Sequence, residues 1–352
     1  MSAETNIQWC DSTVNPVMGC GGCELFPTPE KILGAIDERL SPLGVGWTQG
    51  KSKELFRTLI DGTYKAIKEP DSGHRKFVTT TNIWHLREEF EKRVKAGAGA
   101  VAADAARIVI NQQVTCYAAK LHLNKGLSIV NPGRQPKKGY APTFEIPTRY
   151  DGRVAAMAME KDLFGRKDPD RPWIDGLPRL IFVSDMGDAF TRKTDFGFLI
   201  KEVIEPIRSP EGKRHLWLWL TKRPELMAAF SEQIGDLPEN VCAMTTVTGP
   251  DSLDRIDKLR QVKASVRGLS LEPLWERIPP KRLNLERIDW LILGGESGSG
   301  EDTRPFALEW AEQLRDHCAA NKGRILYEAA REDAHEGPEI IQAQGSSWRR
   351  LG

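Results

Sequence analysis

Residues Leu216–Leu220 read LWLWL, an apolar run of strand length, and the polar sequence TKRPE follows it directly. Short apolar runs of this kind recur between residues 179 and 328, and helical stretches separate them. The other runs are Leu180–Val183, Val241–Met244, Val266–Leu269, Trp290–Leu293 and Ile325–Tyr327, and the helical stretches include Phe196–Ile204, Asp251–Lys263 and Ala307–Asn321. Strands that alternate with helices at this spacing form a parallel sheet with right-handed crossovers. The sequence therefore predicts an α/β fold that closes into a (β/α) barrel, either partial or of six or more strands.

Polar residues follow every one of these apolar runs. The strand ends are Ser184–Asp188, Thr221–Glu225, Thr245–Thr248, Ser270–Pro273, Gly294–Gly298 and Glu328. In a barrel the carboxyl ends of the strands converge on one face, and active sites of such folds lie there. Turns and helix caps alone do not account for six polar strand ends in succession. We therefore predict that the active site lies at this edge of the sheet.

Three charged strand-end residues are candidates for catalysis. Lys222 and Arg223 are either a solvated pair before a helix or substrate contacts, in which case Arg223 would hold a carboxylate in a two-pronged contact. Glu272 is either a charge at a helix terminus or a group that orients an amine or relays a proton. We predict a catalytic role for all three.

Two strand ends are candidates for cofactor binding. The run Gly294-Gly295-Glu296-Ser297 has two interpretations. It is either a flexible turn or a segment whose glycines let a cofactor approach the backbone while Glu296 accepts a hydrogen bond. A glycine run alone is weak evidence for phosphate binding. Ser184 and Asp185 occupy the corresponding position after the first strong strand. The prediction assigns cofactor binding to both strand ends.

Cysteines form the second motif of the chain. Cys20 and Cys23 lie in the glycine-containing sequence NPVMGCGGC with two residues between them, which supplies half of a metal or cluster site. Cys116, in the sequence TCYA, is the best candidate for a third ligand. The sequence thus predicts a metal site formed by Cys20, Cys23 and Cys116. A histidine at the position of His122 more often lies on the surface of a helix. Together with the three cysteines, however, His122 would complete a Cys₃His zinc site.

These residues resemble a phage-associated family of radical-SAM-like proteins with a three-cysteine motif. The resemblance rests on Ile7-Gln8-Trp9, on residues 15–20, on Cys116-Tyr117-Ala118 and on the later strand ends. It covers the N-terminal loop and most of residues 116–328. The family usually keeps its three cysteines in one compact loop, whereas 92 residues separate Cys23 from Cys116 here.

The resemblance implies a [4Fe–4S] cluster on the three cysteines and S-adenosyl-L-methionine (SAM) as the second cofactor. It implies a radical SAM isomerase that converts N-linked glycinyl-thymidine in phage DNA to the C-linked isomer, a thymidine hypermodification that protects viral DNA from host restriction. DNA with the modified base would then be the partner. Two other classes of function remain open. One is a zinc-stabilised nucleic-acid-binding protein without catalysis, and the other is a radical SAM enzyme that acts on tRNA or on a nucleoside.

Composition limits the function in a general way. The 352 residues include 50 Lys and Arg and 49 Asp and Glu, a formal net charge of +1. This balance argues against a histone-like binder held by bulk charge and leaves room for a local basic groove. The basic loop at residues 131–140 is either a solvated connector or a phosphate contact in which Tyr140 stacks on a base.

The N-terminus and the cysteine content indicate a cellular location. The first residues lack a basic region followed by an apolar run, and no segment approaches eighteen uninterrupted apolar residues. Disulfides explain six cysteines poorly in a chain of this kind. We therefore expect a soluble cytoplasmic protein, in the host cytoplasm if a phage encodes it, without membrane contact.

The predicted organisation has three parts. Residues 1–26 hold a first strand, near residues 7–10, and the cluster loop; residues 27–111 form a helical insertion; residues 112–352 hold the third cysteine and the barrel. Within the insertion, apolar spacing predicts helices at Pro29–Leu40, Ser52–Lys68 and Ile83–Arg93. A single helix over Ala102–Leu123 would carry Cys116 back to the first two cysteines.

Overall fold

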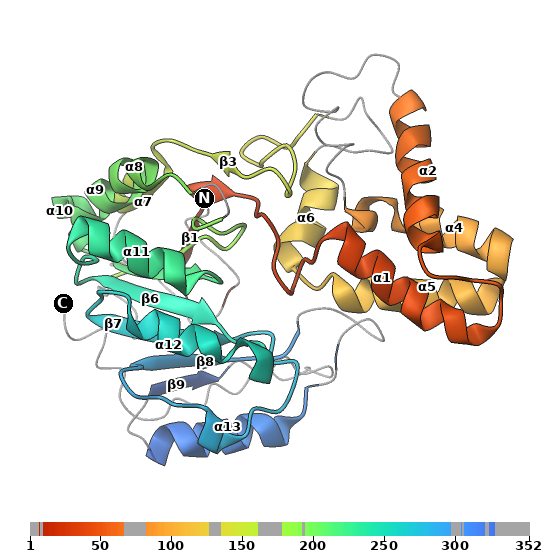
Figure 1. The fold of residues 1–352 in the computed structure, drawn as a ribbon. Helices are drawn as coiled ribbons and strands as arrows, with labels where there is room; N and C mark the ends of the chain where they lie inside the picture. Colours follow the sequence, from red (N-terminus) through yellow and green to blue (C-terminus); the bar gives the residue numbers. More distant parts are fainter. Residues whose placement is uncertain are drawn as a thin grey trace, which may run out of the picture. The chain divides into compact units, whose positions relative to one another are not determined.

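The computed structural model describes residues 7, 10–66, 82–126, 135–160, 178–191, 194–296, 304, 306–320 and 324–327. The chain forms two compact units (Figure 1). Unit 1 comprises Met1–Met18, Arg149–Ser297 and Arg304–Gly352, and unit 2 comprises Gly19–Thr148 and Gly298–Thr303. The predicted boundaries after residues 26 and 111 both fall inside unit 2. The third cysteine therefore belongs to the same unit as the helical insertion and the first two cysteines.

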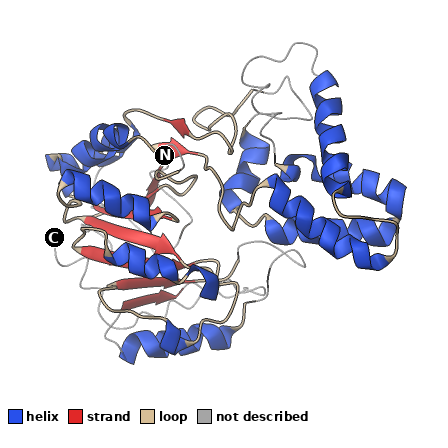
Figure 2. Cartoon of the chain, in the orientation of Figure 1, coloured by secondary structure: helices blue, strands red, loops and turns tan. Residues whose placement is uncertain are grey.

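Unit 1 is built on a seven-stranded parallel sheet, drawn in red in Figure 2. Its strands are β1 (Ser12–Val14), β4 (Leu180–Val183), β5 (Leu216–Thr221), β6 (Val241–Thr246), β7 (Val266–Leu271), β8 (Trp290–Leu293) and β9 (Arg324–Tyr327). They lie in the sheet in the order in which they occur in the chain. The predicted α/β class is confirmed, and all six strands expected between residues 179 and 328 are present.

The first strand differs from the prediction, which placed it near residues 7–10. β1 has only three residues, and it pairs in parallel with β4 in the register Ser12 to Ile181 and Val14 to Val183. Its polar side chains are buried, and Arg179 Nη1 donates to Ser12 Oγ at 3.0 Å. A short strand with two hydroxyl residues lacks the apolar pattern that marks a strand in sequence.

Helices cover one face of this sheet. They are α7 (Arg153–Ala158), α8 (Phe196–Leu199), α9 (Glu205–Arg208), α10 (Pro210–Lys213), α11 (Pro224–Ile234), α12 (Asp254–Arg260) and α13 (Leu308–Ala320), with a π-helical turn, η4 (Ile200–Ile204), and the 3₁₀ turns η5 (Pro250–Ser252) and η6 (Pro280–Arg282). Trp219 of β5 packs against Phe190 and Phe230, with ring centroids 5.0 and 5.8 Å apart. Burial of these large side chains is the main force that holds the helices on the sheet.

The second face of the sheet changes character along the strands. Its amino-terminal part is apolar and includes Phe182, Leu218, Met244 and Ile292. Because side chains alternate between faces, Thr246 lies on the same face as Met244, and its register partner Ser270 lies beside it. The second face therefore turns polar toward the carboxyl edge.

Unit 2 is helical apart from its loops. Its helices are α1 (Pro29–Leu40), α2 (Lys51–Ala66), α4 (Arg87–Ala98), α5 (Ala100–Gln113) and α6 (Tyr117–Lys125), with 3₁₀ turns η1 (Ser41–Leu43) and η2 (Ile83–Leu86). α5 packs against both α1 and α4. Buried Asp37 fixes the loop between α1 and α2, since its carboxylate accepts from Trp47 Nε1 at 2.9 Å and from the amides of Gly50 and Ser52 at 2.6 and 3.0 Å.

The predicted single helix over Ala102–Leu123 is wrong, because it breaks before Cys116. α5 ends at Gln113, and Cys116 has an extended backbone with φ −62° and ψ 108°. The amides of Thr115 and Cys116 donate to the carbonyl of Leu25, at 3.0 and 2.9 Å, instead of to helix carbonyls. Tertiary hydrogen bonds to Leu25 thus replace helical ones.

The remaining strands and the charged surface complete the fold. β2 (Val17–Met18) and β3 (Thr148–Arg149) form a small two-stranded sheet.

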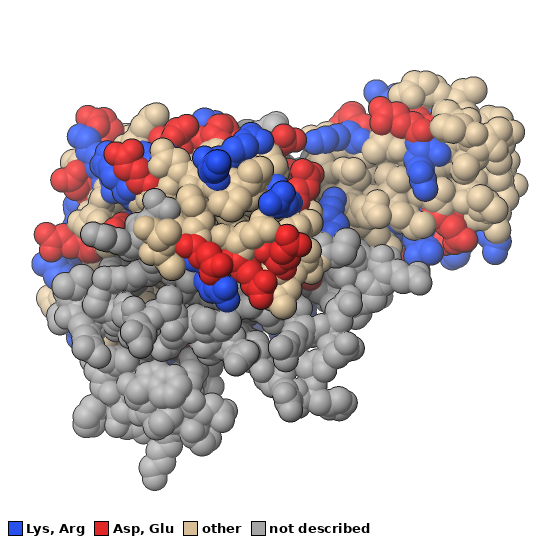
Figure 3. Space-filling model, turned by 90° about the horizontal axis from the view of Figure 1, so that it is seen from below, with Lys and Arg blue, Asp and Glu red and all other residues tan. Residues whose placement is uncertain are grey.

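Among the residues described, no helix has the length and apolarity needed to span a membrane. On the face drawn in Figure 3, Lys and Arg side chains lie among Asp and Glu side chains, which agrees with the near-zero net charge.

Candidate functional site

Ser184, directly after β4, has a strained backbone. Its φ of 77° is in the left-handed region, which a non-glycine residue adopts at a cost of about 1–3 kcal/mol. The amide of Ser184 donates to the carbonyl of Val14 at 2.9 Å, which holds it beside the end of β1. Its buried hydroxyl has no hydrogen-bond partner within the described part of the chain. A buried hydroxyl without a partner is costly unless a ligand or water completes it.

Asn15, at the end of β1, holds the loop after β4. Its side-chain amide donates to Asp185 Oδ1 at 2.5 Å, and its carbonyl oxygen accepts from the amide of Met186 at 2.8 Å. Burial raises the pKa of Asp185, while the hydrogen bond from Asn15 acts in the opposite direction. The side chain of Asn15 thus holds Asp185, a predicted cofactor-binding residue, and the backbone that follows it.

Asp188 joins the end of β4 to the end of β5. Its buried carboxylate accepts from the hydroxyl of Thr221 at 2.9 Å, from the amide of Lys222 at 3.1 Å and from Arg223 Nη1 at 2.8 Å. It also accepts from the amide of Phe190 at 2.9 Å. The sequence prediction did not single out this residue, although it lies in the strand end quoted for Ser184.

The two basic residues at the end of β5 differ in their surroundings. Arg223, predicted to clamp a substrate carboxylate, forms a buried ion pair with Asp188, and only 12% of its side chain is exposed. Lys222 is half-buried, and its ammonium group is not paired with any carboxylate that the structure describes. Lys222 therefore has the more available charge of the two.

The ends of β6 and β7 contribute hydroxyl groups and Glu272. The buried hydroxyl of Thr246 has no partner among the described residues, whereas the hydroxyl of Thr245 donates to the carbonyl of Thr221 at 2.8 Å. Glu272 is half-buried and precedes a cis peptide bond to Pro273. Thr246 lies in the predicted strand end Thr245–Thr248, but no feature of the sequence is a reason to assign it a role.

Glu296, after β8, has a half-satisfied carboxylate. Oε2 lies 3.3 Å from Arg304 Nη1, and the Arg304 guanidinium lies 4.1 Å from the ring centroid of Trp275. Oε1 is buried and has no hydrogen-bond partner among the residues described. A buried carboxylate oxygen without a donor is an unusual feature in a folded protein. Arg304 gives no sequence signal of its own, because nothing in its spacing ties it to Glu296.

The glycines of this strand end have a packing role. Gly294 accepts from the amide of Leu274 at 2.9 Å, and a Cβ on Gly295 would lie 3.0 Å from Cβ of Phe306. The close packing of Phe306 is thus enough to explain why residue 295 is a glycine, and no bound ligand is needed for that explanation. The predicted residues Ser297 and Glu328 lie outside the described residues.

Together these groups define the strand-end site of unit 1. Its members lie at the carboxyl ends of the strands, and three of them carry a buried polar atom without a described partner: Ser184, Thr246 and Glu296. The predicted residues Asp185, Lys222, Arg223, Glu272, Gly294 and Gly295 lie at the same ends. The carboxyl edge of a parallel sheet is where α/β proteins bind ligands.

The cysteine loop, residues 19–26, lies in unit 2 and is joined to Cys116 by backbone hydrogen bonds. Cys23 pairs with Phe26 in an antiparallel bridge, and Cys116 donates its amide to the carbonyl of the intervening Leu25 at 2.9 Å. The amide of Cys20 donates to the carbonyl of Phe144 at 2.8 Å. Segments far apart in sequence therefore hold the backbones of Cys20 and Cys116, while a local bridge holds that of Cys23.

The donor chemistry of this loop fits a metal or cluster, since three thiolates hold iron–sulfur clusters and zinc alike. As placed, however, the side chains of the described residues do not form a group of three or more His, Cys, Asp or Glu that could hold a metal ion. Cys20 is buried, and Cys23 and Cys116 are half-buried. The loop thus supplies ligands of the right kind, without a complete coordination geometry.

His122 is buried on α6, less than two turns after Cys116. Its Nδ1 donates to the carbonyl of Ala118 at 2.9 Å, so Nε2 carries the lone pair, and no described residue bonds to Nε2. Burial lowers the pKa of His122. It is a core histidine rather than a surface one, and it is not grouped with the cysteines in the described structure.

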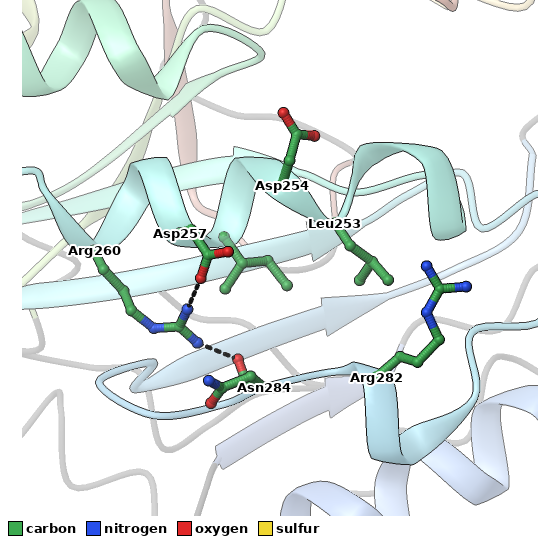
Figure 4. Close-up of a pocket in the computed structure, with 7 residues that line it drawn as sticks. Leu253, Asp254, Asp257, Arg260, Arg282 and Asn284 are labelled. Carbon is green, nitrogen blue, oxygen red and sulfur yellow. Dashed lines mark hydrogen bonds and ion pairs between the residues drawn. The ribbon is translucent and has the colours of Figure 1, made fainter.

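One open pocket lies away from these groups. It has a volume of about 240 Å³ and is lined by Leu253, Asp254, Ile256, Asp257, Arg260, Arg282 and Asn284 (Figure 4). Arg260 pairs with Asp257 and donates to the carbonyl of Asn284. Its residue Asp254 pairs with Lys258, which does not line the pocket, and the pocket lies along α12 rather than at the strand ends.

A family model described as a protein of unknown function, DUF5131, matches residues 115–335, which is more than half of the chain. The chain belongs to the DUF5131 family. The DUF5131 match includes Cys116 and β4–β9 with their strand ends, and it begins after β1, Cys20 and Cys23. Comparison with curated proteins and with solved structures finds no match.

Proposed function

We propose that the protein is a radical SAM enzyme with a [4Fe–4S] cluster on Cys20, Cys23 and Cys116. The observation that carries the proposal is the path of the chain. The cysteine loop follows β1, the outer strand of a parallel sheet in sequential order, and Asn15 bonds the loop after β4 only five residues before Cys20. Sequential order is the order of strands in a (β/α) barrel, so the barrel-like reading of the fold is part of this proposal.

The cluster would supply the electron that cleaves SAM, because three thiolates leave one iron open to the amino and carboxylate groups of SAM. The remaining requirements fall on the protein. Glu296 Oε1 is a buried acceptor for a cationic amine, and the hydroxyl of Ser184 is a buried donor or acceptor. These unsatisfied groups support cofactor binding at the strand-end site.

For the substrate we propose N-linked glycinyl-thymidine in phage DNA, which the sequence resemblance supports. In its conversion to the C-linked isomer, the bond between the thymidine methylene and nitrogen breaks and a bond between that methylene and the glycyl α-carbon forms. The hydrogen lost from the α-carbon ends on nitrogen, so atoms and electrons balance. Lys222 would bind the glycyl carboxylate, since Arg223 is occupied by Asp188. Glu272 would orient the amine.

Metal analysis of protein purified without oxygen tests the proposal. About four irons with sulfide per chain are expected, as a [4Fe–4S] cluster requires, and SAM with a strong reductant should yield 5′-deoxyadenosine. Cys116→Ala should lower iron content and abolish 5′-deoxyadenosine formation. Cys318→Ala is the matched control, because this buried thiol lies on α13 of unit 1 and should leave both unchanged.

The second candidate is a zinc-stabilised nucleic-acid-binding protein. The observation that favours it is the buried Nε2 of His122, which has no described partner and lies on the helix that Cys116 precedes. One zinc per chain, no sulfide and no SAM cleavage would refute the radical function and show that the cysteines are structural, and the binding protein would then be the function to test. If SAM is cleaved but modified DNA is not converted, tRNA and free nucleosides are the substrates to test next.

A further inference from the structure

The segment between Asp104 and Glu145 has an unusual charge distribution. It contains six Lys or Arg residues and no Asp or Glu, although acidic and basic residues are balanced over the whole chain. Beyond α5, its described parts are residues 114–126, which include α6, and residues 135–144. A basic segment without interspersed acids attracts polyanions over a Debye length of about 8–10 Å.

α6 presents an aromatic and aliphatic face to solvent. Tyr117 and Leu121 are exposed by 44% and 38%, and their spacing of four residues places them on one side of the helix. Lys125 follows at the same spacing, and Lys120 is held at this side with its ammonium 5.3 Å from the ring centroid of Trp84. The opposite side of α6 buries Ala118 and His122.

The loop extends this face. The amide of Lys137 donates to the carbonyl of Lys125 at 2.7 Å, so the exposed residues Lys137 and Lys138 follow directly from the end of α6. The ring of Tyr140 packs against His122, with centroids 5.8 Å apart, and is half-buried. Tyr117 is therefore the more exposed of the two tyrosines.

We propose that this surface binds single-stranded nucleic acid. The α6 basic face is defined as Tyr117, Lys120, Leu121, Lys125, Lys137 and Lys138. None of its four lysines forms an ion pair with a carboxylate in the described structure. Lysines contact phosphates, and an exposed aromatic ring stacks on a base regardless of its sequence, which is how proteins hold unpaired strands. Access to a base in DNA likewise requires a nucleotide out of its duplex.

This face would hold the nucleic-acid substrate of the proposed enzyme, and in that respect the inference rests on the proposed function. Binding itself is measured separately from catalysis. The probe is a labelled oligothymidine of about 20 nucleotides, longer than common single-strand site sizes of about 4–16 nucleotides. Fluorescence anisotropy over a range of salt concentrations gives both the affinity and the number of phosphate contacts.

The double variant Lys137→Gln/Lys138→Gln should weaken binding and reduce the slope of log affinity against log salt by about 1.4, since each phosphate contact contributes about 0.7 on a single strand. The control Lys201→Gln/Lys263→Gln removes the same charge from lysines paired with Glu202 and Glu232 and should leave the slope unchanged. An unchanged slope in the first variant, or an equal loss in the control, would overturn the proposal.

Stacking is tested at Tyr117. Tyr117→Ala should weaken oligothymidine binding at least fivefold, as loss of about 1 kcal/mol or more of stacking implies, and Tyr117→Phe should restore it because the ring is kept. Tighter binding of duplex than of single strands, or displacement by polyglutamate but not by oligothymidine, would refute the assignment. If wild-type protein contains zinc and no sulfide but still binds through this face, the proposed enzyme function fails and the inference stands.

Discussion

At the level of single residues, Asp188 shows how one carboxylate orders two strand ends. It accepts hydrogen bonds from the side chains of Thr221 and Arg223 and from two backbone amides. Its own charge is thereby balanced in a buried position. The arrangement fixes the backbone of Lys222 while leaving its ammonium group outside the ion pair. Asp188 is therefore a positioning residue for the end of β5.

Asp188→Asn should destabilise unit 1 by about 3–5 kcal/mol, because it removes the carboxylate that pairs with the buried charge of Arg223. Urea unfolding followed by tryptophan fluorescence measures the change. Glu232→Gln removes one partner of the exposed pair with Lys263, at 2.8 Å, and should cost at most about 1 kcal/mol. Equal effects of the two substitutions would show that the Asp188 pair is not buried in solution.

At the level of elements, the cysteine loop depends on close backbone approaches. Gly19 has a φ of +87°, and a Cβ there would lie 2.5 Å from the carbonyl oxygen of Phe144. The same carbonyl accepts the hydrogen bond from the amide of Cys20. The turn and the ligand backbone thus share one acceptor.

Gly19→Ala is expected to destabilise unit 2 by about 1–3 kcal/mol, since it adds both a left-handed strain and a steric clash. Gly34→Ala provides the opposite control. Gly34 lies in α1, a Cβ there would meet nothing within 4 Å, and alanine should stabilise the helix by about 0.5–1 kcal/mol. Thermal unfolding of both variants separates the two effects, and a neutral Gly19→Ala would contradict the close approach of this turn to Phe144.

The strands and helices that sequence predicts are those whose own residues specify them. β4 and β8 begin and end where the apolar runs do, and α1 coincides with Pro29–Leu40, because burial and local periodicity agree there. The sequence does not reveal β1 or the break before Cys116, since both depend on hydrogen bonds to distant segments. Candidate residues at strand ends can also be predicted, because the end of each apolar run marks where its strand ends. Arg304 and Asn15 owe their positions to tertiary contacts, which no spacing in the sequence reveals.

At the level of the whole molecule, the two units carry different parts of the proposed chemistry. Unit 1 contains the sheet and the strand-end site, and unit 2 contains the three predicted cluster cysteines and the α6 basic face. The DUF5131 match begins at Thr115 and so includes parts of both units. Cys116 falls within the family match although its two predicted partners precede it. Measurements of metal content and of nucleic-acid binding therefore test unit 2, while the free energy of unfolding of Asp188→Asn tests unit 1.

The sequential order of strands also predicts the order in which unit 1 folds. β4 to β8 each pair with the next strand along the chain, whereas β1 must join β4 across the whole of residues 15–179. Closing that longer loop costs about 1.4 kcal/mol more than closing the connection from β4 to β5. Val14→Ala should therefore speed unfolding and leave the refolding rate unchanged, while Leu218→Ala in β5 should slow refolding, as stopped-flow kinetics would reveal. With this result, the segment that leads into the cysteine loop would be the last to dock on a sheet that has already formed, and the rate of its assembly would be separate from that of the core.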